Sequence, residues 1–263
     1  MRLAYELARK SIQRQFAYRA ANLAGFFTNL FFGILRASVM IGIYGSRTEE
    51  AGYSLQDAIT YTALSQAFLS FMFMFGWWDL IRAIKSGEVS TTLIRPVDLF
   101  GWWWWQDVGR AIVQVMWRGL PIVLIFAVLY GLSLPPTLGH WLALPVSMTL
   151  GLLTSFAWRY LVSLTAFWTQ DAIGIGRLAW GVSNLLSGFL APVAFFPDWL
   201  ATLARLTPFP TMVNTPVEVF LGLVDGPGLW QALAAQVFWA AATIAMCHLV
   251  QSAGLRKLVI HGG

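Results

Sequence analysis

Charged residues are scarce in this chain of 263 residues, where they make up 11% of the sequence. A soluble domain typically carries about 25% of charged residues, whereas 58% of the residues here are hydrophobic. The composition therefore predicts an all-α polytopic membrane protein. The net charge of +5 does not indicate nucleic-acid binding, because the basic residues are spread between apolar runs and form no single patch.

Residue types that build catalytic or metal sites are also rare. Cys247 is the single cysteine, so the sequence offers neither an internal disulfide nor a cysteine zinc site. The three histidines are scattered, and the sequence contains no HExxH motif and no GxxxxGK[ST] phosphate loop. We therefore expect no metal site, no catalytic residue and no ATPase activity in this chain.

Six long apolar runs are present instead. Each is close to the ~20 residues that a helix needs to cross ~30 Å of hydrocarbon. We expect membrane-spanning helices at residues 22–44, 57–78, 108–131, 141–168, 178–196 and 229–251. Together they form one transmembrane domain over residues 1–263.

Three segments outside these runs have characters of their own. Residues 1–21 are basic, with Tyr5, Ala8, Ile12 and Phe16 at helical spacing, which predicts an amphipathic helix in the membrane interface. Residues 79–107 form the longest polar interval and end in four consecutive tryptophans, which we interpret as an interfacial anchor.

The third segment, residues 186–222, is apolar but repeatedly broken by proline. This pattern predicts re-entrant or interfacial helices that could close the outer end of a pathway. Its gate candidates are Pro192, Phe196 and Pro197. We expect Asp198 to cap a short helix there.

Lysine and arginine give the orientation. With the N-terminus inside, the outer loops hold only Arg47 and Arg205, and the other basic residues between spans lie on the inner side. This bias predicts that both termini are cytoplasmic.

Arginines inside the predicted spans are costly in hydrocarbon and commonly face a cavity or reach an interface. We expect Arg159 to reach the cytoplasmic side and Arg118 to face a polar cavity at the bundle or dimer centre. Arg36 either reaches the outer interface or lines the pathway. Acids that could pair with them lie only near span ends, namely Asp57, Asp79 and Asp107.

Several stretches together carry a family resemblance. They are KSGEV at residues 85–89, LIRPVD at 93–98, LSG at 186–188 and FPDWL at 196–200, in this order along the chain. With the six apolar runs, they make the chain similar to the permease subunits of bacterial ABC type-2 exporters, in a branch whose members have about this length.

The resemblance implies a partner that supplies energy. Two ATP-binding subunits would hold ATP and Mg, with no cofactor in this chain, and would dock on a coupling loop. The residues that match this loop are Lys85, Ser86, Gly87, Glu88, Leu93 and Arg95.

The resemblance also implies a pathway. The chain would pair with a second copy or a paralogous permease in the bacterial inner membrane, surrounded by lipid. The pathway, lined by spans one, two and five, would export an amphiphilic or cationic compound such as a drug, a lipid or a peptide-like molecule.

Two other functions stay open from the residues alone. An ATP-independent secondary transporter or channel would need no partner ATPase, but proton coupling generally needs a titratable group within the membrane, and only His248 lies deep in a span. A lipid-processing intramembrane enzyme would need paired carboxylates or a His/Ser constellation, and the sequence shows neither.

Overall fold

The computed structural model describes residues 2–72, 78–93, 98–169 and 171–257. Four helical segments in these ranges are long and apolar enough to cross a membrane. Two are single helices, α2 (Arg19–Tyr44) and α12 (Pro227–Leu255). The prediction of an all-α polytopic membrane protein is confirmed.

The other two candidate spans are composite. The segment Leu99–Tyr130 joins α6 (Leu99–Gln114), a π-helical turn η1 (Val115–Gly119) and α7 (Leu120–Tyr130). The segment Leu138–Phe167 joins α8 (Leu138–Leu164) to the 3-10 turn η2 (Thr165–Phe167).

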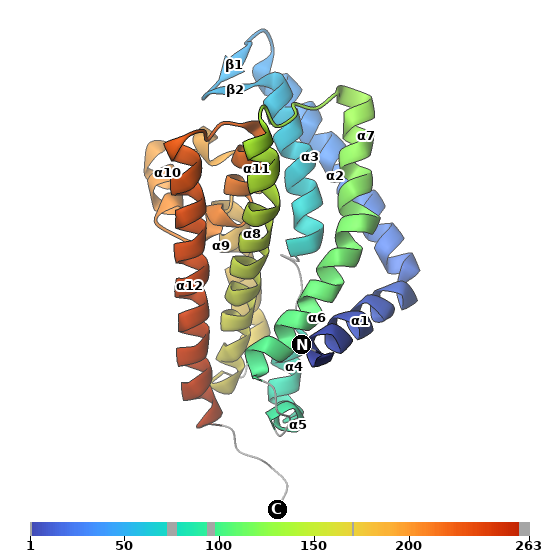
Figure 1. Cartoon of the computed structure of the whole chain (residues 1–263), viewed down its shortest axis with the longest axis vertical. Coiled ribbons are helices and arrows are strands. Elements are labelled where there is room, and N and C mark those ends of the chain that lie inside the picture. Colours follow the sequence, from blue (N-terminus) through green and yellow to red (C-terminus); the bar gives the residue numbers. More distant parts are fainter. Residues whose placement is uncertain (1, 73–77, 94–97, 170, 258–263) are drawn as a thin grey trace, which may run out of the picture.

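The remaining two expected spans are shorter helices. The first, α3 (Leu55–Met72), lies beside α2 and α7 (Figure 1) and is buried along its whole length from Ala58 onward. Burial on all sides explains its many polar residues, because a central helix faces protein and not lipid. The second, α9 (Ala172–Leu186), was expected at 178–196, yet ends where Gly188 takes a positive φ of 79°.

The N-terminal helix α1 (Arg2–Ala17) crosses the lower part of α6 (Figure 1). A Cβ on Gly109 would lie 2.2 Å from the Ala8 carbonyl oxygen, so only glycine permits this approach. The face of α1 that packs against α6 carries Leu7, which is buried. Tyr5 and Phe16 are exposed, although the sequence pattern placed these two residues on one apolar face with Ala8.

The proline-rich segment after α9 folds into short helices that pack against the bundle. They are η3 (Val193–Phe195), α10 (Asp198–Arg205), η4 (Phe209–Thr211) and α11 (Asn214–Leu221). Asp198 does not cap α10 as expected, because it is the first helical residue and Pro197 takes the cap position.

Asn214 ties this segment to the bundle. Its backbone N–H donates to the Ser187 carbonyl at 3.1 Å, and its side-chain Oδ1 accepts from the Val193 backbone N–H at 3.0 Å. The Tyr61 hydroxyl lies 2.7 Å from the Gly188 carbonyl oxygen. The segment is therefore part of the packed bundle and not a solvated linker.

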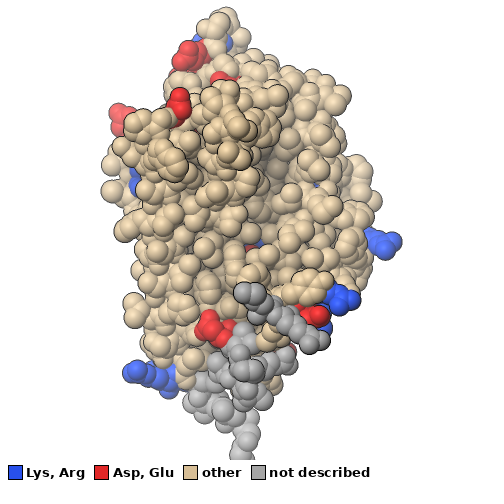
Figure 2. All heavy atoms as spheres, viewed as in Figure 1, with Lys and Arg blue, Asp and Glu red and all other residues tan. Residues whose placement is uncertain are grey.

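Charge separates the ends of the molecule from its middle. On the face in Figure 2, charged side chains gather toward the two ends, and the belt between them is mostly uncharged. A short hairpin of β1 (Glu49–Glu50) and β2 (Tyr53–Ser54) marks one end, beyond α2 and α3 (Figure 1). This distribution suits a protein whose middle faces hydrocarbon.

Candidate functional site: a cavity with two arginines

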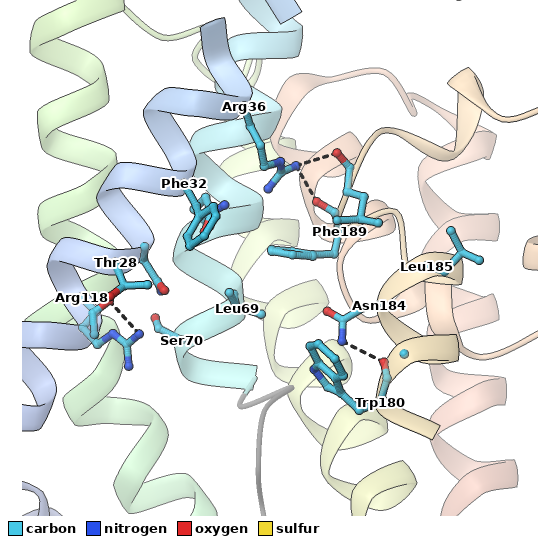
Figure 3. Close-up of a pocket in the computed structure, with 15 residues that line it drawn as sticks. Thr28, Phe32, Arg36, Leu69, Ser70, Arg118, Trp180, Asn184, Leu185 and Phe189 are labelled. Atoms are coloured by element: carbon cyan, nitrogen blue, oxygen red, sulfur yellow. Dashed lines mark hydrogen bonds between the residues drawn. The ribbon is translucent and has the colours of Figure 1, made fainter. Parts of the chain in front are cut away.

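A cavity of about 730 Å³ lies between α2 and α3 on one side and α9 on the other (Figure 3). Its volume falls within the range of small-molecule sites, ~300–1,000 Å³. Its walls are mainly apolar, and they include Phe32, Leu69, Leu185, Phe189 and Leu190. Polar groups are few and come from separate helices.

Arg36 projects from α2 into the cavity (Figure 3). Its Nη2 donates to the carbonyl oxygens of Phe189 at 2.5 Å and Leu190 at 3.0 Å. The guanidinium carbon lies 4.9 Å from the centre of the Phe189 ring. Nε and Nη1 are buried and have no hydrogen-bond partner within the described structure.

Arg118 enters the cavity from the π-helical turn η1, on the far side from Arg36 (Figure 3). Its Nη2 donates to the Gly25 carbonyl at 3.0 Å. A Cβ on Gly25 would lie 2.7 Å from the guanidinium carbon, so the side chain rests where Gly25 leaves room. Nε is buried, and no partner for it is found in the described ranges.

Three amides complete the polar lining. Asn29 from α2, Gln66 from α3 and Asn184 from α9 are each at least nine-tenths buried. Asn29 Nδ2, Gln66 Oε1 and Asn184 Oδ1 lack a hydrogen-bond partner among the described residues. Buried polar atoms are nearly always satisfied, so this cluster indicates room for a polar group that is not part of the chain.

The structure brings together only some of the pathway candidates. Arg36 and Arg118 line the cavity, whereas Pro192, Phe196 and Pro197 do not. Sequence reasoning missed Asn29, Gln66 and Asn184. A signal existed, since Asn29 and Gln66 interrupt apolar runs, but which face of each helix they occupy is not readable from one run alone.

The third intramembrane arginine belongs to another site. Arg159 donates from Nη2 to Asp107 Oδ2 at 2.8 Å, and Arg110 donates from Nε to Asp107 Oδ1 at 2.9 Å. The expectation that Arg159 reaches the cytoplasmic side is wrong, because a fully buried carboxylate holds it inside the bundle. Asp107 was one of the acids expected to be able to pair.

The Asp107 cluster (Asp107, Arg110 and Arg159) also fixes the end of α3. Arg110 donates to the carbonyls of Ser70 at 3.1 Å and Phe71 at 2.6 Å. The cluster therefore holds the last turn of α3, next to the cavity-lining Ser70.

The expected docking loop contains two short helices, α4 (Asp79–Lys85) and α5 (Val89–Leu93). Between them, Gly87 has a φ of 74°, which favours glycine. Lys85, Ser86, Gly87 and Glu88 are all exposed at this bend. Leu93 ends α5, and its side chain and the whole of Arg95 lie outside the described residues.

Helix α6 begins within the segment 79–107. Asp98 caps it by accepting from the Gly101 N–H at 3.0 Å, so the helix begins at Leu99. The four tryptophans at 102–105 are therefore helical, and Trp105 is the most exposed of them. Their role as an interfacial anchor stays a prediction.

A tight contact links this loop to the cavity wall. A Cβ on Gly176 of α9 would lie 2.2 Å from the ring of Trp78, the residue that precedes α4. The same helix carries Asn184 and Leu185 into the cavity. Trp78 therefore packs directly against α9, one wall of the cavity.

Comparison with protein families gives a match over most of the chain. Residues 30–262 match the family model described as ABC-2 family transporter protein. The chain belongs to this family. None of the curated proteins compared with the chain matches it.

Membership has consequences for the site. The chain is a multi-pass membrane component of an ABC-2 transporter, and it works with a separate ATP-binding subunit and is not itself the ATPase. The described residues contain no group of three or more His, Cys, Asp or Glu that could hold a metal ion.

Proposed function

We propose that this chain is the permease subunit of an ATP-driven exporter. It would pair with a second copy or a paralogous permease in the inner membrane, with both termini in the cytoplasm. ATP and Mg would bind to the partner ATPase. The compound moved would be amphiphilic, because the cavity combines apolar walls with a few polar groups.

The observation that carries the proposal is the position of the cavity. It is lined by α2, α3 and α9, which occupy the places of the first, second and fifth expected spans. The family resemblance assigns the transport pathway to these three elements. The cavity therefore supplies a site for a transported molecule in the part of the fold where a permease needs one.

The bend around Gly87 supports the docking role. Its residues Lys85 to Glu88 are exposed, whereas Leu80, Ile81 and Ile84 of the preceding α4 are buried. A buried helix face anchors the element in the bundle, and the exposed tip stays available for a partner. The Trp78–Gly176 contact connects this element to α9, one wall of the cavity.

Charge reversal at the bend tests the proposal. The tagged chain is isolated from its native membranes, and its partner is identified as a phosphate-loop ATPase. The Glu88→Lys variant should lose this partner or uncouple ATP hydrolysis from transport while still inserting in the membrane. The matched control is Glu49→Lys, an exposed glutamate in the hairpin at the other end.

The outcomes separate clearly. Loss of coupling with Glu88→Lys alone supports docking at the bend. Normal coupling with Glu88→Lys would remove the bend from the docking surface. Transport that persists without any ATPase would overturn the exporter proposal and favour a secondary transporter or channel.

A further inference from the structure

We propose that the cavity binds an amphiphile with an anionic head group, a phosphate or a carboxylate, and this assignment rests on the proposed function. The charge of the lining carries the inference. Arg36 and Arg118 both line the cavity, and no carboxylate of the described residues does. A cation would meet two guanidinium groups without a counter-charge, so the site opposes the cationic compounds that the family resemblance admits.

The free donors point to the same ligand class. Arg36 offers Nε and Nη1, and Arg118 offers Nε, all buried without a partner in the described structure. Asn29 Nδ2 adds a neutral donor. An anionic oxygen accepts from such groups in charge-assisted hydrogen bonds, which are about twice as strong as neutral ones.

Of the two arginines, Arg36 is the better binding site for the head group. One nitrogen of its guanidinium, Nη2, already donates to the carbonyls of Phe189 and Leu190, so the side chain is oriented before the ligand binds. Two of its nitrogens stay available. Preorganisation of this kind lowers the entropy lost on binding.

The apolar body of the ligand has a place as well. Phe32, Leu69 and Phe189 lie around the space below Arg36 in Figure 3. Arg118 contacts Gly25, about three helical turns from Arg36 along α2, or roughly 16 Å at ~1.5 Å per residue. One small head group cannot bridge both arginines, so Arg118 forms a second, separate binding site.

Arg36 could instead serve only to cap the carbonyls after α9. A structural role of that kind would change stability but would not produce a preference for ligand charge. Charge selectivity is therefore the readout that separates the two roles.

The experiment uses the full chain, purified in the neutral detergent dodecyl maltoside without any ATPase. Binding of dodecyl phosphate and of dodecyltrimethylammonium is measured by thermal shift, because the two probes share a chain length and differ in charge. The wild-type chain should bind the phosphate at least ten times more tightly. Arg36→Gln should weaken phosphate binding about tenfold, and Arg118→Gln by a smaller factor.

Two further variants keep the test sharp. Arg36→Lys should recover most of the phosphate binding, because it keeps the positive charge. Arg256→Gln, at an exposed site after α12, should leave binding unchanged and controls for general surface charge. Each variant must elute as the wild type does in size-exclusion chromatography before it is compared.

Equal binding of the two probes, or unchanged phosphate binding by a folded Arg36→Gln variant, would overturn the assignment. So would an equal loss with Arg256→Gln, because the effect would then be one of net charge. Failure of the exporter proposal is recognised separately, since it concerns ATP coupling, which this binding measurement does not involve.

Discussion

Arg110 and Arg159 share one buried carboxylate, whereas the hydrogen bonds of Arg36 and Arg118 in the described structure go to carbonyl and amide oxygens. Both pairs lie in the apolar part of the bundle. The first pair closes around Asp107 and the end of α3. The second pair faces a cavity and leaves nitrogen donors without a partner in the described part of the chain.

The difference separates structural from functional charge. A buried ion pair whose hydrogen bonds are satisfied can hold helices in one arrangement, and removing one member exposes the other to a strong desolvation cost. An arginine whose nitrogen donors stay unpaired in a cavity contributes little to the stability of the fold. Charged groups within membranes commonly mark substrate pathways. The comparison therefore predicts opposite responses to mutation.

The largest effect should come from Asp107→Asn. The substitution removes the counter-charge of two buried guanidinium groups, and breaking a buried pair in this way costs about 3–5 kcal/mol. We expect a large fall in the thermal unfolding temperature in neutral detergent and a lower yield in membranes. Glu49→Gln, in the exposed hairpin, is the control and should behave as the wild type. A stable Asp107→Asn protein would contradict a structural role for the cluster.

The two partners of Asp107 should differ from each other. Arg110→Met also frees the carbonyls of Ser70 and Phe71, whereas Arg159→Met leaves them held. With ~1–3 kcal/mol for each buried polar group left unsatisfied, Arg110→Met should be the more destabilising of the two. Thermal unfolding of both variants, compared side by side, checks the order. A reversed order would show that the hold on α3 contributes little.

Arg118→Leu should be far milder for stability. It loses the hydrogen bond to Gly25, worth ~1 kcal/mol net, and a long one of 3.5 Å to Gln114 Oε1. It also removes a charge that is costly in hydrocarbon. We expect the unfolding temperature to change little, while ATP-driven accumulation of a fluorescent anionic amphiphile in inside-out vesicles falls about tenfold, the equivalent of ~1.4 kcal/mol. Normal transport by this variant would refute a pathway role for Arg118.

Some of these features can be predicted from the sequence and others cannot. Apolar runs predicted the long helices well, since length and hydropathy decide what can cross a bilayer. They placed α9 too far along the chain, at 178–196, because Gly188 ends that helix inside an apolar run. A buried helix such as α3 needs no apolar surface, so its polar residues made its boundaries harder to read.

The site was less predictable than the fold. Arg36, Arg118 and Asp107 could be singled out because charge is costly in hydrocarbon. The pairing of Asp107 with Arg110 is local, since both lie on α6 three residues apart, but the pairing with Arg159 depends on how α6 and α8 pack, and that is a tertiary property. The same reason hid the contribution of Asn184, which reaches the cavity only because α9 lies opposite α2 and α3.

Glycine offers a subtler test of the cavity arginines. Gly25→Ala places a methyl group where the Arg118 guanidinium lies and should move that side chain aside, which is possible because it is flexible. Gly42→Ala, in the same helix, meets no atom within 4 Å and is the matched control. Both changes raise helix propensity, by up to ~1 kcal/mol. Only Gly25→Ala should weaken dodecyl phosphate binding, by a few-fold, and equal binding by both variants would show that the position of Arg118 does not matter.

The smallest effect concerns a buried acid outside the candidate membrane spans. Glu218 of α11 accepts a hydrogen bond from the Tyr53 hydroxyl at 3.2 Å, and burial raises the pKa of this carboxyl above its usual range. A raised pKa in the folded state means that the stability it contributes is present at low pH and is lost as pH rises through the folded-state pKa. The neutral variant Glu218→Gln avoids that loss, so its thermal stability relative to the wild type should increase between pH 5 and pH 8. A Glu218→Gln protein whose relative stability falls over the same interval would mean that the folded state favours the charged carboxylate at this position.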